Sequence, residues 1–185
     1  MATVLIDSKT PVDIAYLSDK SNMLRWRKTI NKMNPDIDVD TVLDIGDVST
    51  ISIMIGKLYK CKVENTTGEL DEIRIGGQYQ VITMFEVLEH LLNPLHVLIQ
   101  INESLLDRGR LYITTPCPKP YFLWGKRHFH EMTWSRLKYL IDKAGFEVIK
   151  KSKVRAHPYW FHLTGIRPLL KFFYNKHWFL ELRPK

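Results

Sequence analysis

Short apolar runs alternate with amphipathic stretches along the chain. The runs at 41–46, 80–85, 110–115 and 146–154 have the length and β-branched content of buried strands. Between and before them, the segments 22–33, 49–59, 93–109 and 134–144 space their apolar residues as helices do, and a weaker strand is expected at 61–64. This alternation predicts an α/β fold, with a mostly parallel sheet and helices on both faces.

Polar residues stand where two of these strands end. Asp44 and Gly46 follow the first strand, and the segment 85–91, FEVLEHL, follows the strand at 80–85. Parallel sheets bind ligands beyond the carboxyl ends of their strands, so both segments should face one crevice. If FEVLEHL is helical, Glu86, Glu89 and His90 share one face.

The length and composition are those expected of a soluble, single-domain protein. At 185 residues the chain suits a single domain with its own core, and 45% hydrophobic and 25% charged residues are ordinary for a soluble protein. Two cysteines without a metal or disulfide pattern, a start lacking a secretory layout and no apolar run of about 18 residues favour the cytoplasm.

Charge is distributed unevenly. The net charge is +7, yet residues 119–185 hold 15 Lys and Arg against 4 Asp and Glu, while residues 1–118 hold 12 against 16. The basic third predicts contact with an anionic partner, and the alternative is a solvated face that only aids solubility.

Several stretches resemble class I S-adenosylmethionine-dependent methyltransferases. They read TVLDIG, YQVITMFEVLEHLLNP, LLDRGRLYITTP and HFHEMTWSRLKYLIDKAGFEVI, and together span residues 41 to 154. The resemblance implies a Rossmann-like, seven-stranded sheet with one antiparallel edge strand. It further implies methyl transfer from S-adenosylmethionine to a hydroxyl. The implied cofactor-binding residues are Asp44, Gly46, Asp47, Glu64 (on the ribose) and Phe85.

The chain departs from this family at the cofactor turn. Val48 and Thr50 occupy later glycine positions of the D-x-G-x-G-x-G pattern, and β-branched residues tolerate positive φ poorly. The interval from Gly46 to Tyr79 is short, which predicts that one strand–helix unit is absent. Two hypotheses follow: an enzyme with an altered cofactor turn, or a non-catalytic binding or partner protein that has lost the cofactor.

The residues of FEVLEHL predict two further roles. Glu86, Glu89, His90 and His130 resemble the Mg²⁺ or Mn²⁺ ligands of some methyltransferases, and carboxylates with imidazole suit such ions. The alternative is a purely structural cluster. With or without metal, His90 is the candidate base and Glu86 its catalytic companion, because an imidazole titrates near neutral pH.

The organisation predicted is a helical lead-in (1–40), a methyltransferase-like domain (41–154) and a basic, aromatic C-terminal extension (155–185). The extension mixes aromatic and basic residues, which suits a membrane interface or stacked bases; packing on the sheet or on a second subunit is the alternative. The acceptor is expected to be a small molecule, a glycan or a lipid-linked saccharide. Nucleic acid is a weaker alternative without a reading motif.

Overall fold

The computed structural model describes residues 20–35, 38–72, 74–121, 124, 127–155 and 174–185. Six strands form one sheet in the order β2-β1-β3-β4-β6-β5. The strands are β1 (Val42–Asp44), β2 (Val63–Asn65), β3 (Tyr79–Phe85), β4 (Leu105–Pro116), β5 (Phe146–Arg155) and β6 (Lys176–Pro184). The helices are α2 (Lys20–Ile30), α3 (Thr50–Tyr59), α4 (Pro94–Glu103) and α5 (Trp134–Lys143), with a 3₁₀ helix, η1 (Leu88–His90).

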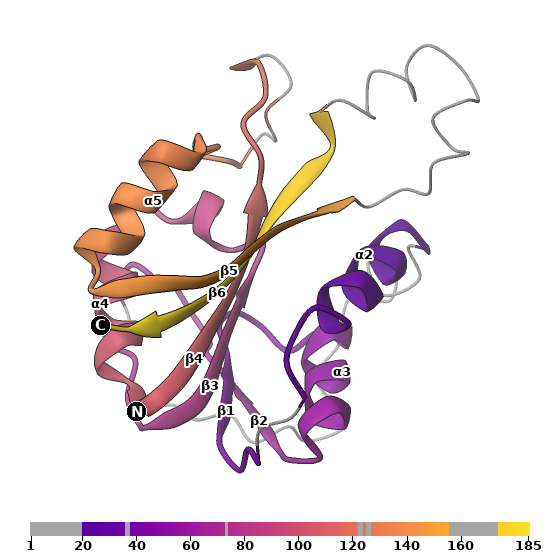
Figure 1. Cartoon of the computed structure of the whole chain (residues 1–185), viewed down its shortest axis with the longest axis vertical. Helices are drawn as coiled ribbons and strands as arrows, with labels where there is room; N and C mark the ends of the chain where they lie inside the picture. The colour runs from indigo at the N-terminus through magenta and orange to yellow at the C-terminus, as the bar shows by residue number, and fades with distance from the viewer. Residues whose placement is uncertain (1–19, 36–37, 73, 122–123, 125–126, 156–173) are drawn as a thin grey trace.

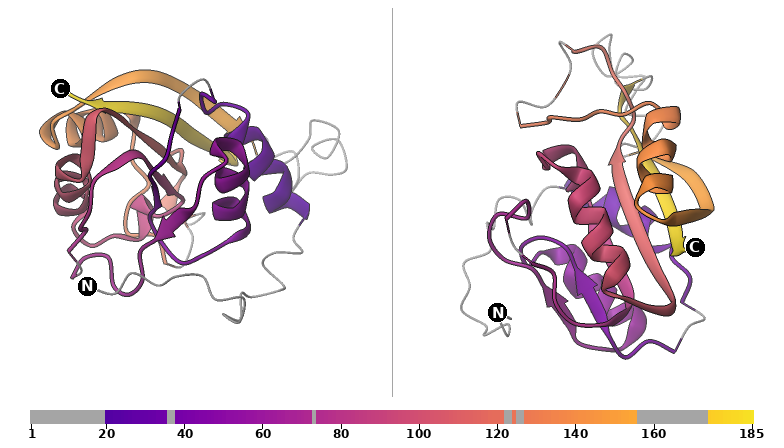
Figure 2. Two further views of the ribbon diagram at one scale, coloured as in Figure 1. Left: turned by 90° about the horizontal axis from the view of Figure 1, so that it is seen from below. Right: turned by 90° about the vertical axis from the view of Figure 1, so that its left-hand side faces the viewer.

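Helices cover both faces of the sheet, as predicted. In Figure 1, α4 and α5 lie on one side of the twisted sheet and α2 and α3 on the other, and Figure 2 (right) shows α4 and α5 in front of it. No helix among the described residues is long and apolar enough to cross a bilayer.

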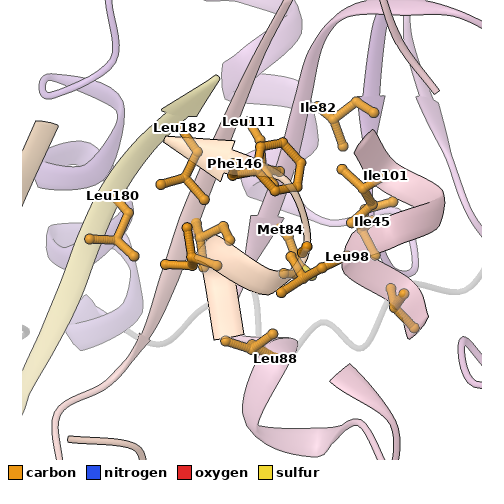
Figure 3. Packing of buried hydrophobic residues seen from close by; sticks show 14 of the residues in the cluster. Ile45, Ile82, Met84, Leu88, Leu98, Ile101, Leu111, Phe146, Leu180 and Leu182 are labelled. Atoms are coloured by element: carbon orange, nitrogen blue, oxygen red, sulfur yellow. The ribbon is translucent and has the colours of Figure 1, made fainter. Parts of the chain in front are cut away.

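Two apolar layers hold the helices on the sheet. On the α4/α5 face, residues of β3, β4 and β6 pack against α4 and η1, as Figure 3 shows for Met84, Leu98, Leu111 and Leu182. On the opposite face, Trp26 and Ile30 of α2 and Ile55 of α3 are buried against Val81 of β3. The predicted stripe of the first helix is therefore confirmed.

The antiparallel strand lies inside the sheet and not at its edge, where we expected it. β6 runs antiparallel to both β4 and β5, and β5 is the edge strand. Residues 176–184, which the sequence analysis assigned to an extension, thus complete the sheet, with Phe179, Leu180 and Leu182 fully buried. Aromatic packing on the sheet, one of the alternatives, holds for Trp178 and Phe179; residues 156–173 of that segment lie outside the described residues.

The short interval between β2 and β3 leaves β2 at the other edge of the sheet. The described residues between Asn65 and Tyr79 form turns and no regular helix or strand. The sheet therefore has six strands where the resemblance implies seven, in line with the expected missing strand–helix unit. The carboxyl ends of β1, β3 and β4 still meet at one edge, because these strands are parallel.

Candidate active site

Asp44 is a buried carboxylate that ties the turn after β1 to its neighbours. Its two oxygens accept hydrogen bonds from Ser52 Oγ and Thr83 Oγ1, each at 2.6 Å, and Asn65 Nδ2 lies 3.5 Å away. Burial raises the pKa of Asp44 to about 6, against the lowering effect of these hydrogen bonds. Because its oxygens already have protein donors, Asp44 holds the shape of the turn.

Gly46 begins the turn in a conformation that favours glycine, with φ +113°. Its N–H donates to Thr66 Oγ1 at 2.8 Å, and a Cβ built on it meets only Val87 Cγ2 at 3.8 Å. Three non-glycine residues in the described part of the chain have positive φ, and none is in this turn. Val48 and Thr50 thus adopt ordinary backbone conformations, so the conformational objection to them does not apply. Asp47 is exposed.

The end of β2 carries the expected acid and a polar residue that the sequence analysis missed. Glu64 Oε2 accepts a hydrogen bond from the Tyr79 hydroxyl at 2.7 Å, and burial together with this carboxylate raises the pKa of Tyr79 to about 12. Asn65, on the opposite face, donates from Nδ2 to the Gly46 carbonyl at 3.1 Å, while its Oδ1 is buried without a partner. The sequence signal that could have identified Asn65 is its position at the end of a strand, next to Glu64.

Glu86 lies in a sharp bend after β3 and outside any helix. Its φ is +59°, a conformation uncommon for a side-chain-bearing residue and frequent at functional sites. Its Oε2 lies 2.9 Å from Arg25 Nη1 and 2.7 Å from His177 Nδ1. Burial alone would raise the pKa of Glu86, but His177 and Arg25 hold it at about 2. Phe85, the residue before the bend, is half-buried against the α2/α3 layer.

The expectation that Glu86, Glu89 and His90 share one helical face is wrong. η1 begins at Leu88, so the bend at Glu86 separates that side chain from the other two. Glu89 is 1% exposed and accepts a hydrogen bond from Thr115 Oγ1 at 3.2 Å. Burial, and then the charge of Glu86, raise the pKa of Glu89 to about 8.

Two imidazoles meet beside Glu89. His90 and His128 lie edge to face, with ring centroids 4.9 Å apart. His90 Nδ1 is 2.9 Å from the Arg127 carbonyl oxygen, and His128 Nδ1 is 2.8 Å from Glu131 Oε1. Carbonyl and carboxylate oxygens only accept, so both Nδ1 atoms donate. In the neutral rings, each Nε2 therefore keeps a lone pair.

The residues able to hold a cation differ from the predicted set. Glu89, His90 and His128 each offer a ligand atom, and these atoms all lie within 4.8 Å of one another, a donor set that fits a divalent ion. Glu86 and His130 are not in this group: Glu86 contacts Arg25 and His177, and the backbone N–H of His130 donates to the Glu89 carbonyl. His128, which the sequence analysis did not select, lies three residues before Glu131, the carboxylate that its Nδ1 contacts.

Comparisons with known proteins identify the family. A family model described as a methyltransferase domain matches residues 45–151, more than half of the chain. None of the curated proteins matches the sequence.

Solved structures share the fold at low sequence identity. An O-methyltransferase of a Brevibacillus brevis multienzyme, in complex with S-adenosyl-L-homocysteine, has a TM-score of 0.66 at 13% identity, over 92% of this chain and 75% of that one. The N-methyltransferase NodS from Bradyrhizobium japonicum has a TM-score of 0.61 at 10% identity, over 90% of this chain and 98% of that one. The [4+2]-cyclase SpnF has a TM-score of 0.64 at 11% identity, over 98% of this chain and 86% of that one.

These neighbours agree on the architecture and differ in chemistry, since they include O-methylation, N-methylation and a cyclase activity. Identities of this size establish the fold alone, and the reaction must be argued from the site. The family match covers residues 45–151 and so includes η1, which carries Glu89 and His90, and the segment between β4 and α5, which carries His128. The chain belongs to the methyltransferase domain family and has its Rossmann-like class I fold.

Proposed function

We propose that this protein transfers a methyl group from S-adenosylmethionine to a hydroxyl of its acceptor, with His90 as the base. The observation that carries the proposal is the fixed orientation of the His90 ring, whose Nδ1–H donates to the Arg127 carbonyl at 2.9 Å. The lone pair on Nε2 is then available on an exposed side chain at the carboxyl end of β3. That end of the sheet is where proteins of this fold class bind ligands.

The methyl donor, when bound, supplies a sulfonium methyl group. The chain's own residues then orient the acceptor and remove the hydroxyl proton to His90 Nε2, which makes the oxygen a better nucleophile. Glu86 stays ionised and holds Arg25 and His177 in place around the bend, so we assign it a positioning role in catalysis.

The cofactor site we propose lies between the turn after β1 and the end of β2. Gly46 and Asp47 would offer backbone groups beside the N-terminus of α3, which suits a polar ligand. Glu64 would accept the ribose hydroxyls in place of the Tyr79 hydroxyl, and Phe85 would flank the same edge. The orphaned Oδ1 of Asn65 supports this location, as does Gly46, where an added Cβ would contact Val87 Cγ2 at 3.8 Å and no other side chain.

A second candidate role, which would take the place of proton removal by His90, uses the same lone pairs to bind Mg²⁺ or Mn²⁺ with Glu89, His90 and His128. Glu131 orients His128 as carboxylates commonly orient metal-binding histidines. The test is a titration of the protein with Mn²⁺, in which binding is measured as the loss of the electron paramagnetic resonance signal of the free ion. We expect His128→Ala to weaken binding at least tenfold and His130→Ala, two residues away, to leave it unchanged. Equal binding by wild type and H128A would remove the ion from the proposal.

The competing function is a non-catalytic methyltransferase-fold protein that binds a partner. The missing strand–helix unit and the side chains of Val48 and Thr50 favour it. Titration calorimetry of the full chain with S-adenosylmethionine and S-adenosyl-L-homocysteine separates the two. Micromolar binding is expected, and absence of heat at millimolar ligand would favour the partner protein.

The acceptor also remains part of the proposal. A small molecule, a glycan or a lipid-linked saccharide in the cytoplasm suits a base that is exposed at the sheet edge. A panel of hydroxyl and amine compounds, tested by release of S-adenosyl-L-homocysteine, checks the choice of oxygen. Turnover confined to amines would contradict O-methylation.

A further inference from the structure

Two lysines of β5 lie against two tryptophans on the α4/α5 side of the sheet. Lys151 Nζ is 4.0 Å from the centroid of the Trp134 ring and 5.9 Å from that of Trp178. Lys153 Nζ is 4.6 Å from the Trp178 centroid, and the two indole rings are 5.6 Å apart. We call Trp134, Lys151, Lys153 and Trp178 the Trp–Lys cradle. The aromatic rings hold the ammonium groups in defined positions.

The positive charge of this cradle is not neutralised. Lys151 and Lys153 are exposed, and in the part of the chain that the structure describes neither makes an ion pair. The first turn of α5 has no acidic residue and adds the exposed Arg136. Glu131, three residues before α5, is buried and lies 3.1 Å from Lys119 Nζ and 2.8 Å from His128 Nδ1. Among the described residues no carboxylate pairs with Lys151 or Lys153, so both ammonium groups are available to an anion.

The cradle lies on the same face and edge of the sheet as the candidate active site. Thr115 of β4, Trp178 of β6 and Lys153 of β5 are direct cross-strand partners, so their side chains lie in one row on one face. At one end of the row, Thr115 Oγ1 donates to Glu89. Two strand spacings separate Thr115 from Lys153, which is about 10 Å.

We propose that the Trp–Lys cradle binds a phosphate group carried by the methyl acceptor, at the far end of the cross-strand row whose near end, Thr115, contacts Glu89 of the candidate active site. This inference rests on the proposed function, because it names the acceptor class of the same site. A hydroxyl adjacent to the phosphate is too close to span the row. A phosphorylated molecule with one or two rings between the two groups has the required length.

The experiment is calorimetric titration of the full chain with inorganic pyrophosphate at low ionic strength. We expect saturable binding by wild type and at least tenfold weaker binding by the double variant K151Q/K153Q. The matched control is K143Q, because Lys143 also lies over an aromatic ring, that of Tyr139, 5.5 Å away on the last turn of α5. Binding by K143Q should stay within twofold of wild type. No binding by wild type, or equal losses in both variants, would overturn the proposal.

A second arm separates a phosphate on the acceptor from a phosphate on a membrane surface. Co-sedimentation with phosphatidylglycerol vesicles, against phosphatidylcholine vesicles, should be unchanged in K151Q/K153Q. If the double variant loses vesicle binding and keeps pyrophosphate binding, the cradle is a membrane contact and the proposal is wrong. Pyrophosphate and S-adenosylmethionine are titrated separately, so loss of one leaves the other interpretable. Failure with pyrophosphate alone overturns this inference, and failure with S-adenosylmethionine alone overturns the proposed function.

Discussion

The two sides of the sheet edge differ in how their polar groups are used. On the β1–β2 side, the carboxylate of Asp44 is occupied by Ser52 and Thr83, and Glu64 by Tyr79. On the β3–β4 side, one oxygen each of Glu86 and Glu131 is buried without a partner, and burial raises the pKa of Glu89 to about 8. Apart from the unpartnered Oδ1 of Asn65, the polar groups of the first side hold one another in place, whereas the second side keeps more of its groups available for chemistry. The departures from the family pattern at Val48 and Thr50 fall on the first side.

The largest effect is expected at His90. His90→Ala should lower the release of S-adenosyl-L-homocysteine by about 10²- to 10⁴-fold, because a positioned base contributes rate enhancements of that order. The affinity for S-adenosylmethionine should remain within about threefold, since His90 lies on the acceptor side. A parallel loss of affinity for S-adenosylmethionine would show that His90 contacts the cofactor and would contradict its assignment to the acceptor side.

Glu86 should have the next largest effect, on stability. Glu86→Gln leaves Arg25 and His177 without their carboxylate, which should reduce the free energy of unfolding at pH 7 by about 3 kcal/mol. Because the pKa of Glu86 falls from about 4.5 to about 2 on folding, its contribution is complete above about pH 4.5.

The pH profile tests that origin. The stability difference between wild type and E86Q should shrink as the pH falls from 4.5 towards 2, when measured by urea unfolding. A difference that stays constant over this range would show that packing, and not the charge of Glu86, is responsible.

A smaller effect is expected at the end of β2. Tyr79→Phe removes the hydroxyl that donates to Glu64, at a cost of about 1 kcal/mol in the free energy of unfolding. The freed carboxylate should bind S-adenosylmethionine a few-fold more tightly if it takes the ribose. Calorimetry gives the affinity, and Glu64→Gln should cancel the gain. An unchanged affinity in Y79F would remove Glu64 from the cofactor site.

The smallest effect is expected at Val48. Its backbone has no positive φ, so Val48→Gly should change cofactor affinity by less than about threefold and reduce stability by only about 0.5–1 kcal/mol. The stability follows from thermal unfolding and the affinity from calorimetry. A tenfold gain in affinity would show that the valine side chain fills the cofactor site. The β1–β2 side would then be a cofactor site impaired by its own side chains.

The alternation of apolar runs and amphipathic segments was sufficient to predict the fold class. The stripe Trp26–Ile30 and the helix ending before Gly145, whose φ is +82°, lie where the periodicity placed them. These features depend on local sequence, which a pattern records directly. β6 was missed because its pairing with β4 and β5 joins segments distant in the chain, and no local pattern encodes that order.

The site was predicted only in part, because its local pattern is visible in the sequence and its long-range contacts are not. FEVLEHL correctly indicated polar groups at a strand end, but the left-handed bend at Glu86 directs that side chain to Arg25 and His177. A helical wheel assumes an unbroken helix and cannot anticipate the bend. His128 was passed over in favour of His130 because only the folded loop shows that Glu131 orients it.

The position of β6 has a consequence for how the molecule is made. β4 and β5 precede it in the chain; until residues 176–184 have left the ribosome, β4 can pair only with β3, and β5 lacks its neighbour in the sheet. Until then, β4 presents an open edge beside β3, and a strand edge of this kind pairs readily with other chains. Assembly of the nascent protein therefore depends on a late insertion of distant sequence, a slow kind of step during which chaperones have time to act.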